Sequence, residues 1–407
     1  MDGVRQELRI QIHRDLSSLA EEWRQLEDIG VGGPHDTLDW VEGWYTFTGR
    51  KAGIDPVIVS GQDETGRLCF ILPLGLRRHR GLAILQWLAS DQGNYASGLY
   101  HPDFWALAGD TPGPALLQSL VPHLPQADLI HLESIPRSVG GRPGPFSGLP
   151  LVADATCGHS FRLDGGADDY FRTHLNKKAR GNLKRSERRL RELGELRFRQ
   201  AQGADEVRTG LAALILQKRE WCRQRGVADF LEQPEVQSFY ESVLLREDGN
   251  AESRALLFTL DLDGEIIATN LGMRFGEEFH GLITTITHGD LRRFSPGNVL
   301  FRMMVEDVAA RGVRVIDWGA GENDLKAKWC NVERERAHAV VALSARGAVA
   351  APVLRMLLRL KAWIKTSPAL WRLATQIRLT KGLLARLALA LSGRGGRSRL
   401  ASRSVEA

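Results

Sequence analysis

A short loop of basic and small residues, from Arg292 to Gly297 (RRFSPG), offers the clearest chemistry in the sequence. It lies between a predicted strand at 279–287 and a predicted helix at 298–311. Small residues let a phosphate approach the backbone, and the free N–H groups at a helix start would bind it. Ser-Pro-Gly sequences also begin helices that bind no ligand, so the loop indicates a phosphate site without requiring one. The candidate phosphate-binding residues are Arg292, Arg293, Ser295, Gly297, Asn298 and Val299.

Three ionisable residues stand at or after the end of the next predicted strand, at 313–318, and could carry acid–base or anion-stabilising chemistry. Asp317 lies near the end of that strand, and Asp324 could accept a proton. Lys326 could stabilise a developing negative charge or bind an anionic acceptor. Each has an ordinary alternative, because a strand-ending aspartate often caps a helix and a loop lysine is usually solvated. We take Lys326, Asp317 and Asp324 as candidate catalytic residues.

A basic helix predicted over 168–193 is a second candidate for binding an anion. Four of its cations repeat at spacings of four, four and three, which places them on one helical face. This stripe indicates an anionic acceptor, a phosphate-bearing donor or a membrane-linked saccharide carrier, with a solvated surface helix as the alternative. Few aromatic residues interleave with the charges, so nucleic acid is not expected as the main partner. The stripe comprises Arg180, Lys184, Arg188 and Arg191, and Arg180 and Lys184 are our candidate substrate-binding residues.

The predicted elements place the loop inside a mixed sheet that the N-terminal half repeats faintly. The C-terminal half reads as three strands, a helix and two strands, at 255–262, 265–273, 279–287, 298–311, 313–318 and 338–344. The N-terminal half reads as two helices, three strands, a helix and a strand, at 17–27, 38–48, 56–60, 68–76, 82–88, 115–124 and 128–133. The repetition predicts a duplicated supersecondary unit. The fold class is therefore α+β (mixed α/β), with two mixed twisted sheets flanked by helices.

A glycine- and proline-rich segment at 136–148 separates the two halves as a linker or long loop. We predict three parts: a degenerate first unit at 1–150, a catalytic unit at 151–345 and a basic amphipathic helical tail at 346–407. The first unit has no comparable phosphate loop after its third strand, so we expect it to shape a cleft together with the second.

Charge is strongly segregated along the 407 residues, although the net charge is only +5. The tail at 346–407 carries +12 and the segment 172–199 carries +8, so the remaining residues carry −15. A uniformly basic coat for nucleic acid is therefore excluded, and two positive segments on an acidic body remain. The four cysteines are far apart and form no cluster with histidine, so no metal site is expected.

The tail contains an amphipathic helix at 354–365. Its apolar arc comprises Met356, Leu357, Leu360, Trp363 and Ile364, opposite Arg355, Arg359, Lys361 and Lys365, with Leu354 and Leu358 as exceptions. Such a helix either docks on the domain or lies on an anionic membrane surface. Residues 392–407 are expected to be disordered. The sequence shows neither a signal core nor a membrane-spanning run, so we expect a cytoplasmic protein, with peripheral membrane contact through 346–407 as an option.

The strand order, together with the Arg-x-x-small-x-Gly loop, resembles the core of the GNAT acyltransferases. Arg292 and Gly297 match that family's pyrophosphate loop, and Ser295 replaces its first glycine. Residues 8–345 resemble the CelD-type branch, named for bacterial cellulose biosynthesis, through the basic helix, the Ser-Pro-Gly loop and the stretch 317–326. Leu325 stands where that family usually has tyrosine. The chain is also similar to Fem-type transferases, which are built from two GNAT-like units.

The resemblance implies a bacterial acyltransferase that uses acetyl-CoA, or another acyl-CoA, as co-substrate and needs no metal. It implies acyl transfer to an amine or hydroxyl of an envelope or exopolysaccharide precursor, a small, saccharide or lipid-linked acceptor. One alternative is a Fem-like transferase that takes its acyl group from aminoacyl-tRNA. Another is a non-catalytic scaffold or membrane adaptor that kept the fold, to which the Leu325 departure gives weight.

Overall fold

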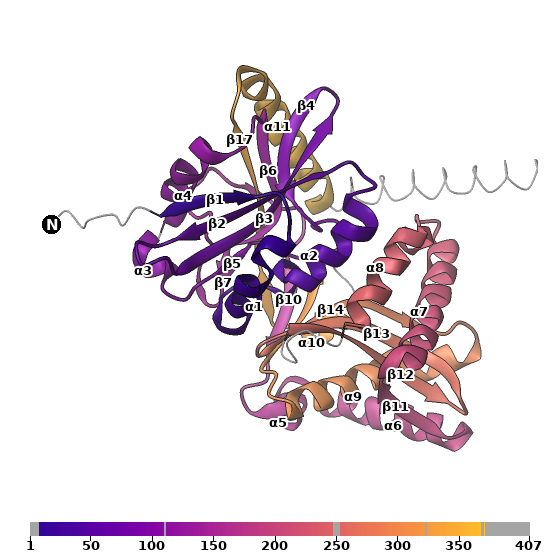
Figure 1. Ribbon diagram of the computed structural model, residues 1–407. Coiled ribbons are helices and arrows are strands. Elements are labelled where there is room, and N and C mark those ends of the chain that lie inside the picture. Colours follow the sequence, from indigo (N-terminus) through magenta and orange to yellow (C-terminus); the bar gives the residue numbers. More distant parts are fainter. Residues whose placement is uncertain (1–7, 110, 247–252, 322–323, 368–369, 371–407) are drawn as a thin grey trace, which may run out of the picture.

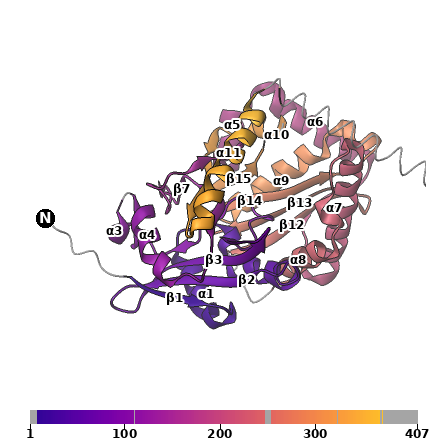
Figure 2. The same cartoon turned by 90° about the horizontal axis from the view of Figure 1, so that it is seen from above.

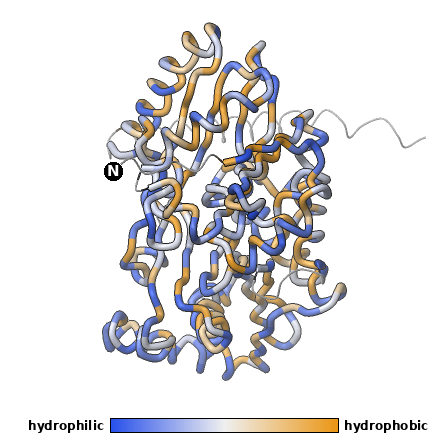
Figure 3. The backbone as a smooth tube through the Cα atoms, turned by 60° about the vertical axis from the view of Figure 1, so that its left-hand side comes forward, coloured by the Kyte–Doolittle hydropathy of each residue, from blue (hydrophilic) through white to orange (hydrophobic). Residues whose placement is uncertain are grey.

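The computed structural model describes residues 8–109, 111–246, 253–321, 324–367 and 370. Within them, two large mixed sheets carry helices on their faces (Figures 1 and 2). We call each sheet with its helices the first and the second unit. Figure 3 shows hydrophobic and hydrophilic residues alternating along the helices, as expected when one face of each is buried. The mixed α/β class is confirmed.

The first sheet is antiparallel except where β4 and β6 run parallel. Its strand order is β1 (Arg9–His13), β2 (Asp55–Gln62), β3 (Leu68–His79), β4 (Leu82–Trp87), β6 (Leu129–Pro136), β17 (Arg336–Ala342) and β9 (Val152–Ala153). The short strand β5 (Leu99–Tyr100) pairs with β3. Its helices are α1 (Ala20–Ile29), α2 (Leu38–Trp44), α3 (Phe104–Ala108), α4 (Pro112–Leu120) and α11 (Ala345–Thr366).

The second sheet repeats this plan, with one parallel pair, β14 and β15. Its strand order is β11 (Leu196–Gln200), β12 (Ser253–Leu262), β13 (Glu265–Phe275), β14 (Glu278–Ile286), β15 (Val315–Ala320), β10 (Gly158–Arg162) and β16 (Val332–Arg334). Its helices are α5 (Gly166–His174), α6 (Lys177–Leu193), α7 (Gly203–Arg225), α8 (Pro234–Leu244), α9 (Pro296–Ala310) and α10 (Asp324–Trp329).

The two units exchange their sixth strands. β10 follows the first unit in sequence yet pairs with β15 of the second sheet. β17 follows the second unit yet pairs with β6 of the first, so gold β17 and α11 stand among purple strands in Figure 1. The strand predicted at 338–344 therefore forms, but as part of the other sheet. Local periodicity predicts a strand and does not identify its neighbour.

The units also share a hydrophobic core. Helices α1 and α2 of the first unit pack with α7 and α8, which cover one face of the second sheet. Trp40 and Phe239 lie at the centre of this contact, with ring centroids 4.8 Å apart. Helices α5, α6 and α9 pack over the opposite face of the second sheet. This shared core fixes how loops of the first unit meet strands of the second.

The structure corrects one predicted helix and adds a short hairpin to one predicted loop. The single helix expected over 168–193 is two helices, because the chain is extended at Leu175 and Asn176. The Asn176 side chain caps α6 by accepting a hydrogen bond from the Ala179 N–H at 2.8 Å. The segment 136–148, expected as a linker or long loop, forms a small hairpin from β7 (Ser138–Val139) and β8 (Arg142–Pro143).

Helix α11 docks on the first unit, over β6, β9 and β17. Leu358 is buried and Leu354 packs beside it, although both were exceptions on the predicted apolar arc. Among the described residues, no helix is long and apolar enough to cross a membrane. The segment 392–407, expected to be disordered, lies outside the described residues.

Candidate active site

Strands β14 and β15 separate after a short parallel contact. They pair at Glu278 with Val315, Phe279 with Ile316 and His280 with Asp317, and beyond that register they diverge. Pairing between β13 and β14 also skips one residue, Leu282, which is a β-bulge. Backbone groups on β14 beyond residue 280 therefore face a gap instead of a strand on the β15 side.

The gap contains a cavity of about 750 Å³. It extends from the β14 bulge to the loop before α9 and is bordered on another side by α7. Its lining includes backbone and side chains of 281–286 with Trp318, Ala320 and Gly321 from the end of β15. A cavity between diverging parallel strands is where open mixed sheets commonly bind ligands.

Four of the predicted phosphate-binding residues meet at one end of this cavity: Arg292, Ser295, Gly297 and Asn298. Ser295 has a φ of +52° and precedes α9, which begins at Pro296. The backbone N–H groups of Asn298 and Val299 donate to the Ser295 carbonyl, at 3.0 and 3.4 Å. Gly297, in the first helical turn, presents its N–H where no intrahelical acceptor precedes it.

The other two predicted residues lie off the cavity. Val299 is fully buried in the core beneath α9. Arg293 is exposed, and its guanidinium carbon lies 4.9 Å from the centroid of the Phe294 ring. The structure therefore places Arg292 at the cavity and leaves its neighbour outside the lining.

Positive charge dominates the cavity wall. Its ionisable side chains among the described residues are Lys218, Arg225, Arg292 and Lys326, with no carboxylate. Lys218 Nζ lies 4.4 Å from the Trp221 ring centroid, and the Arg225 guanidinium carbon lies 4.8 Å from the same ring. Burial lowers the pKa of Lys218. This arrangement suits a ligand that carries phosphates and an aromatic or apolar part.

Lys326 lines the cavity and also holds the end of β15. Its ammonium group donates to the Gly319 carbonyl at 3.1 Å and to the Ala320 carbonyl at 2.6 Å. The residue is buried, with 8% of its surface exposed. It thus fixes the backbone of the diverging strand while keeping a cation at the cavity.

Asp317 is fully buried and does not line the cavity. The Tyr95 hydroxyl donates to its two carboxylate oxygens at 3.0 and 3.2 Å, and the Gly319 N–H donates at 2.6 Å. Arg334 Nε lies 3.3 Å from the same carboxylate. Asp317 therefore anchors the end of β15 through Gly319 and joins the two units through Tyr95. The side chain of Asp324, the third candidate catalytic residue, lies outside the described part of the structure.

A second carboxylate belongs to the same buried network. Glu278 pairs with both terminal nitrogens of Arg334 at 2.9 and 3.0 Å, and His280 Nε2 lies 2.9 Å from it. Burial alone would raise the pKa of Glu278, but the His280 hydrogen bond and the Arg334 charge hold it well below its usual range. Glu278 is therefore ionised at neutral pH, and the network is a paired structural one.

Burial also sets the protonation state of two neighbours of Asp317. Burial and then the Asp317 charge raise the pKa of Tyr95 well above its usual value, so this phenol remains a hydrogen-bond donor. The same two causes raise the pKa of Cys330 to about 12. Cys330 is therefore a thiol at neutral pH, which excludes it as a ready nucleophile.

Comparison with known protein families shows that most of the cavity lining lies within a recognised domain. Residues 177–327 match the acetyltransferase (GNAT) domain family. The chain therefore contains a GNAT-type acyltransferase domain, which spans a little over a third of its length and includes the loop before α9. No curated protein matches the chain.

Solved structures extend the likeness in fold beyond the GNAT domain. The crystal structure of FemX is similar at a TM-score of 0.59 and 12% identity, covering 85% of this chain and 100% of FemX. L-PGS from Bacillus licheniformis has a TM-score of 0.44 at 12% identity, covering 78% of this chain and 96% of its own. A tandem GNAT protein from the clavulanic acid biosynthesis pathway has a TM-score of 0.43 at 13% identity, covering 83% and 99%. Of these three, the FemX structure is the one similar enough to support the two-unit fold.

The sequence did not point to Asn94, which the first unit contributes to the GNAT domain's cavity. Its amide nitrogen donates to the Gly281 carbonyl of β14, and its amide oxygen accepts from the Ala320 N–H of β15, both at 3.4 Å. Asn94 therefore spans the gap between the diverging strands. The one available signal was the run of small and polar residues at 89–98 after the third strand of the first unit.

The basic helix α6 lies outside the cavity. Neither Arg180 nor Lys184 lines it. Lys184 is exposed, and Arg180 donates to the Arg172 carbonyl. Helix α6 packs against α9 and against η6 (Asp290–Phe294), the turn that contains Arg292. Its exposed cations thus lie on a helix that contacts the turn containing Arg292, without entering the cavity.

Proposed function

We propose that the protein transfers an acyl group, acetyl being our first choice, from an acyl-CoA to an amine or hydroxyl acceptor. The observation that carries this proposal is the cavity between β14 and β15, which joins a β-bulge to Arg292 and the start of α9. The positive wall suits the phosphates of the donor, and the bulge leaves strand N–H groups available to a thioester carbonyl.

The residues of the cavity divide into two roles in this proposal. Arg292, Ser295, Gly297 and Asn298 hold the pyrophosphate end of the donor. Lys326 orders the end of β15 and supplies a cation beside the reacting centre. Asp317 acts as a positioning residue through Gly319, because its carboxylate is buried away from the cavity. Asp324 stays a candidate base.

Donor binding tests the proposal directly. Acetyl-CoA is titrated into the full-length protein by calorimetry, with Arg292→Ala as the variant and Arg314→Ala, an exposed arginine outside the lining, as the matched control. We expect loss of one charge-assisted contact to weaken binding by about tenfold or more in Arg292→Ala only. Absence of acetyl-CoA binding to the wild-type protein would contradict the proposal and favour a non-catalytic scaffold.

A Fem-like reaction with aminoacyl-tRNA as donor is the second candidate, and the position of α6 favours it. This helix presents exposed cations next to the turn that contains Arg292. A polyanionic donor would contact them through its phosphates. Acetyl-CoA and aminoacyl-tRNA are compared as donors with the wild-type protein and with Lys184→Ala. If transfer requires aminoacyl-tRNA and is slower in Lys184→Ala, the donor is aminoacyl-tRNA and not acetyl-CoA.

The acceptor is proposed from the CelD-type resemblance of the basic helix, the Ser-Pro-Gly loop and residues 317–326: an envelope or exopolysaccharide precursor. Arg180 and Lys184 are the proposed contacts for an anionic acceptor. Acetyl transfer to saccharide precursors with and without a phosphate group tests this choice. A preference for the uncharged form would remove these two residues from the proposal.

Helix α11 supports a further part of the proposal, peripheral contact with an anionic membrane. Its face opposite the docked one exposes six apolar side chains: Val349, Val353, Met356, Leu357, Leu360 and Trp363, each 45–74% exposed. Arg359 and Lys361 flank this arc, and both are exposed. An exposed apolar stripe between cations is the pattern of a helix that lies in a lipid interface.

Co-sedimentation with vesicles tests the membrane contact in the full-length protein. The variant Leu360→Glu/Trp363→Glu places charge on the exposed stripe, and Leu216→Glu does so at an equally exposed residue of α7. We expect the first variant to lose binding to anionic vesicles and the second to keep it. Equal partitioning of all three proteins would show that the stripe does not contact lipid.

A further inference from the structure

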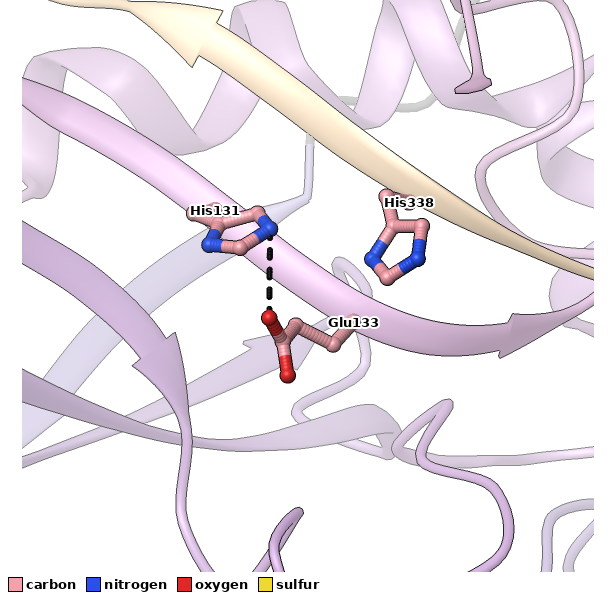
Figure 4. Close-up of side chains that lie close together, drawn as sticks. All are labelled: His131, Glu133 and His338. Carbon is pink, nitrogen blue, oxygen red and sulfur yellow. Dashed lines mark ion pairs between the residues drawn. The ribbon is translucent and has the colours of Figure 1, made fainter. Parts of the chain in front are cut away.

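A cluster of potential metal ligands lies outside the lining of the GNAT cavity, on the seam where the exchanged strand β17 joins the first sheet. His131 and Glu133 are two residues apart on β6, so they share a face, and His338 comes from β17. One ligand atom of each residue lies within 4.8 Å of the others. Figure 4 shows the two imidazole rings facing each other with the carboxylate below them.

Two ring nitrogens of this cluster, one from each histidine, lack hydrogen-bond partners among the described residues. His131 Nε2 and His338 Nδ1 are buried and unpartnered within the described part of the chain. His131 Nε2 lies 3.4 Å from a Glu133 oxygen, a distance that permits an ion pair but here lacks hydrogen-bond geometry. Buried polar atoms without partners are uncommon and often mark an unseen ion or water.

The surroundings of His338 match a second feature of metal sites. Its other ring nitrogen, Nε2, lies 3.7 Å from an Asp154 carboxylate oxygen. Asp154 is in turn fixed by Arg336, at 2.7 Å. A carboxylate on the far side of a histidine orients the ring and increases its basicity toward a metal. Asp154, held by its ion pair with Arg336, lies on the Nε2 side of the His338 ring. The Nδ1 side of the ring faces His131 and Glu133 (Figure 4).

We propose that His131, Glu133 and His338 bind one Zn²⁺ ion, with a water as fourth ligand. Two imidazoles and a carboxylate are a donor set that zinc prefers, and Glu133, 49% exposed at its side chain, leaves the fourth position open to solvent. Tetrahedral zinc ligands lie about 3.4 Å apart, so atoms that lie within 4.8 Å of one another must approach by up to about 1.4 Å, within reach of side-chain rotations.

Charged residues of both signs surround the cluster, and together they determine how strongly it attracts a metal cation. Lys361 of α11 acts on both histidines, and Arg336 of β17 acts on His338. Glu133 and Asp154 oppose them, and Arg336 is already paired with Asp154. A bound zinc ion would join β6 of the first unit to β17, the strand that follows the second unit in sequence. The ion would therefore hold the exchanged strand in place.

Zinc binding to the metal-stripped full-length protein, without any affinity tag, tests the site. Competition with a chromogenic chelator gives the stoichiometry and affinity for the wild-type protein, Glu133→Gln, His131→Ala/His338→Ala and His79→Ala. His79 is an exposed histidine on β3 outside the cluster and serves as the control. We expect one Zn²⁺ per chain in the wild-type and His79→Ala proteins, about tenfold or greater weakening in Glu133→Gln, and loss in the double variant.

A thermal measurement guards against variants that fail to fold. Zn²⁺ should raise the melting temperature of the wild-type protein by a few degrees, and EDTA should reverse this, since an ion bound only to the native state stabilises it. Glu133→Gln, altered at a half-exposed side chain, should fold and show a smaller shift. The proposal is overturned if the wild-type protein binds no zinc, or if Glu133→Gln binds zinc as tightly and is stabilised as much as the wild type. These readouts do not depend on acyl transfer.

Discussion

The two units have the same strand order, but they use the gap beside their parallel strands in opposite ways. In the first sheet, β4 and β6 pair at two positions, Ile84 with Leu129 and Leu85 with Ile130. The chain after β4 then covers the gap itself, and the Ala96 N–H donates to the Ser134 carbonyl at 3.3 Å. In the second sheet, the corresponding gap is the cavity of about 750 Å³.

The difference follows from what comes after the third strand of each unit. After β14, residues 287–295, which include η6, lead directly to α9, so the start of a helix lies at the open gap. After β4 the chain runs through residues 88–128 before β6, and this longer segment fills its own gap. The same segment sends Asn94 and Tyr95 into the second unit. The first unit thus supports the candidate site of the second unit.

The comparison predicts its largest effect at Asp317, the buried charge that holds the open gap. Asp317→Ala would leave Arg334 with one fewer carboxylate and Tyr95 without its acceptor. Breaking a buried ion pair costs about 3–5 kcal/mol. The matched change in the first unit is Ser134→Ala, which removes a hydroxyl 3.3 Å from Arg336 and should cost about 1 kcal/mol. Urea unfolding of both variants measures the difference, and similar losses would show that the two gaps are held alike.

A second prediction concerns pH, because the pKa values of two buried carboxyl groups, one in each unit, are shifted in opposite directions. Burial raises the pKa of Glu27, in α1, to about 7, whereas that of Glu278 is lowered. A raised carboxyl pKa means that the folded state holds the proton more tightly than the unfolded state. Glu27 therefore costs stability progressively as pH rises from about 4.3 to about 7, by about 4 kcal/mol. Glu278 instead contributes stability above its unfolded pKa, near 4.3, which is lost only as pH falls through its lower folded value.

Urea unfolding of Glu27→Gln and Glu278→Gln between pH 5 and 8 tests this contrast. Glu27→Gln keeps an acceptor for the Leu38 N–H, which lies 2.6 Å from Oε1, and removes the charge. We expect Glu27→Gln to be more stable than wild type at pH 8 and nearly equal at pH 5. Glu278→Gln should be less stable across the whole range. Parallel pH curves for wild type and Glu27→Gln would refute the raised pKa.

Much of the second unit could be predicted from the sequence, because its signals are local. The Asp263-Gly264 turn between β12 and β13, the Ser-Pro-Gly start of α9 and the alternation of β14 all depend on neighbours in the chain. Arg292, Gly297 and Lys326 could therefore be placed near one another. The order from β12 to β15 followed from the resemblance to the GNAT core, whereas β10, β11 and β16 were not predicted.

What could not be predicted depends on residues distant in sequence. His338 lies in a strand whichever sheet it joins, so the exchange with β10 leaves no local trace. Asn94 looks like an ordinary loop residue until the shared core brings its loop to β14. Leu354 and Leu358 seemed to break the pattern of an amphipathic helix, but they are the residues that dock α11. In each case the hydrophobic periodicity was compatible with more than one structure, and tertiary packing determined which one formed.

The smallest predicted effect tests whether the first unit's loop truly occupies the second unit's gap. Gly319 has a φ of +67°, and a Cβ there would lie 2.2–2.3 Å from side-chain atoms of Asn94. Gly319→Ala should therefore cost about 1 kcal/mol for its left-handed backbone and about 1 kcal/mol more for displacing Asn94. In an Asn94→Ala background only the backbone cost remains. Urea unfolding of the four proteins gives the coupling directly. Additive losses would mean that Asn94 does not fill the space beside Gly319, and the gap would then be open to solvent on the side of the first unit.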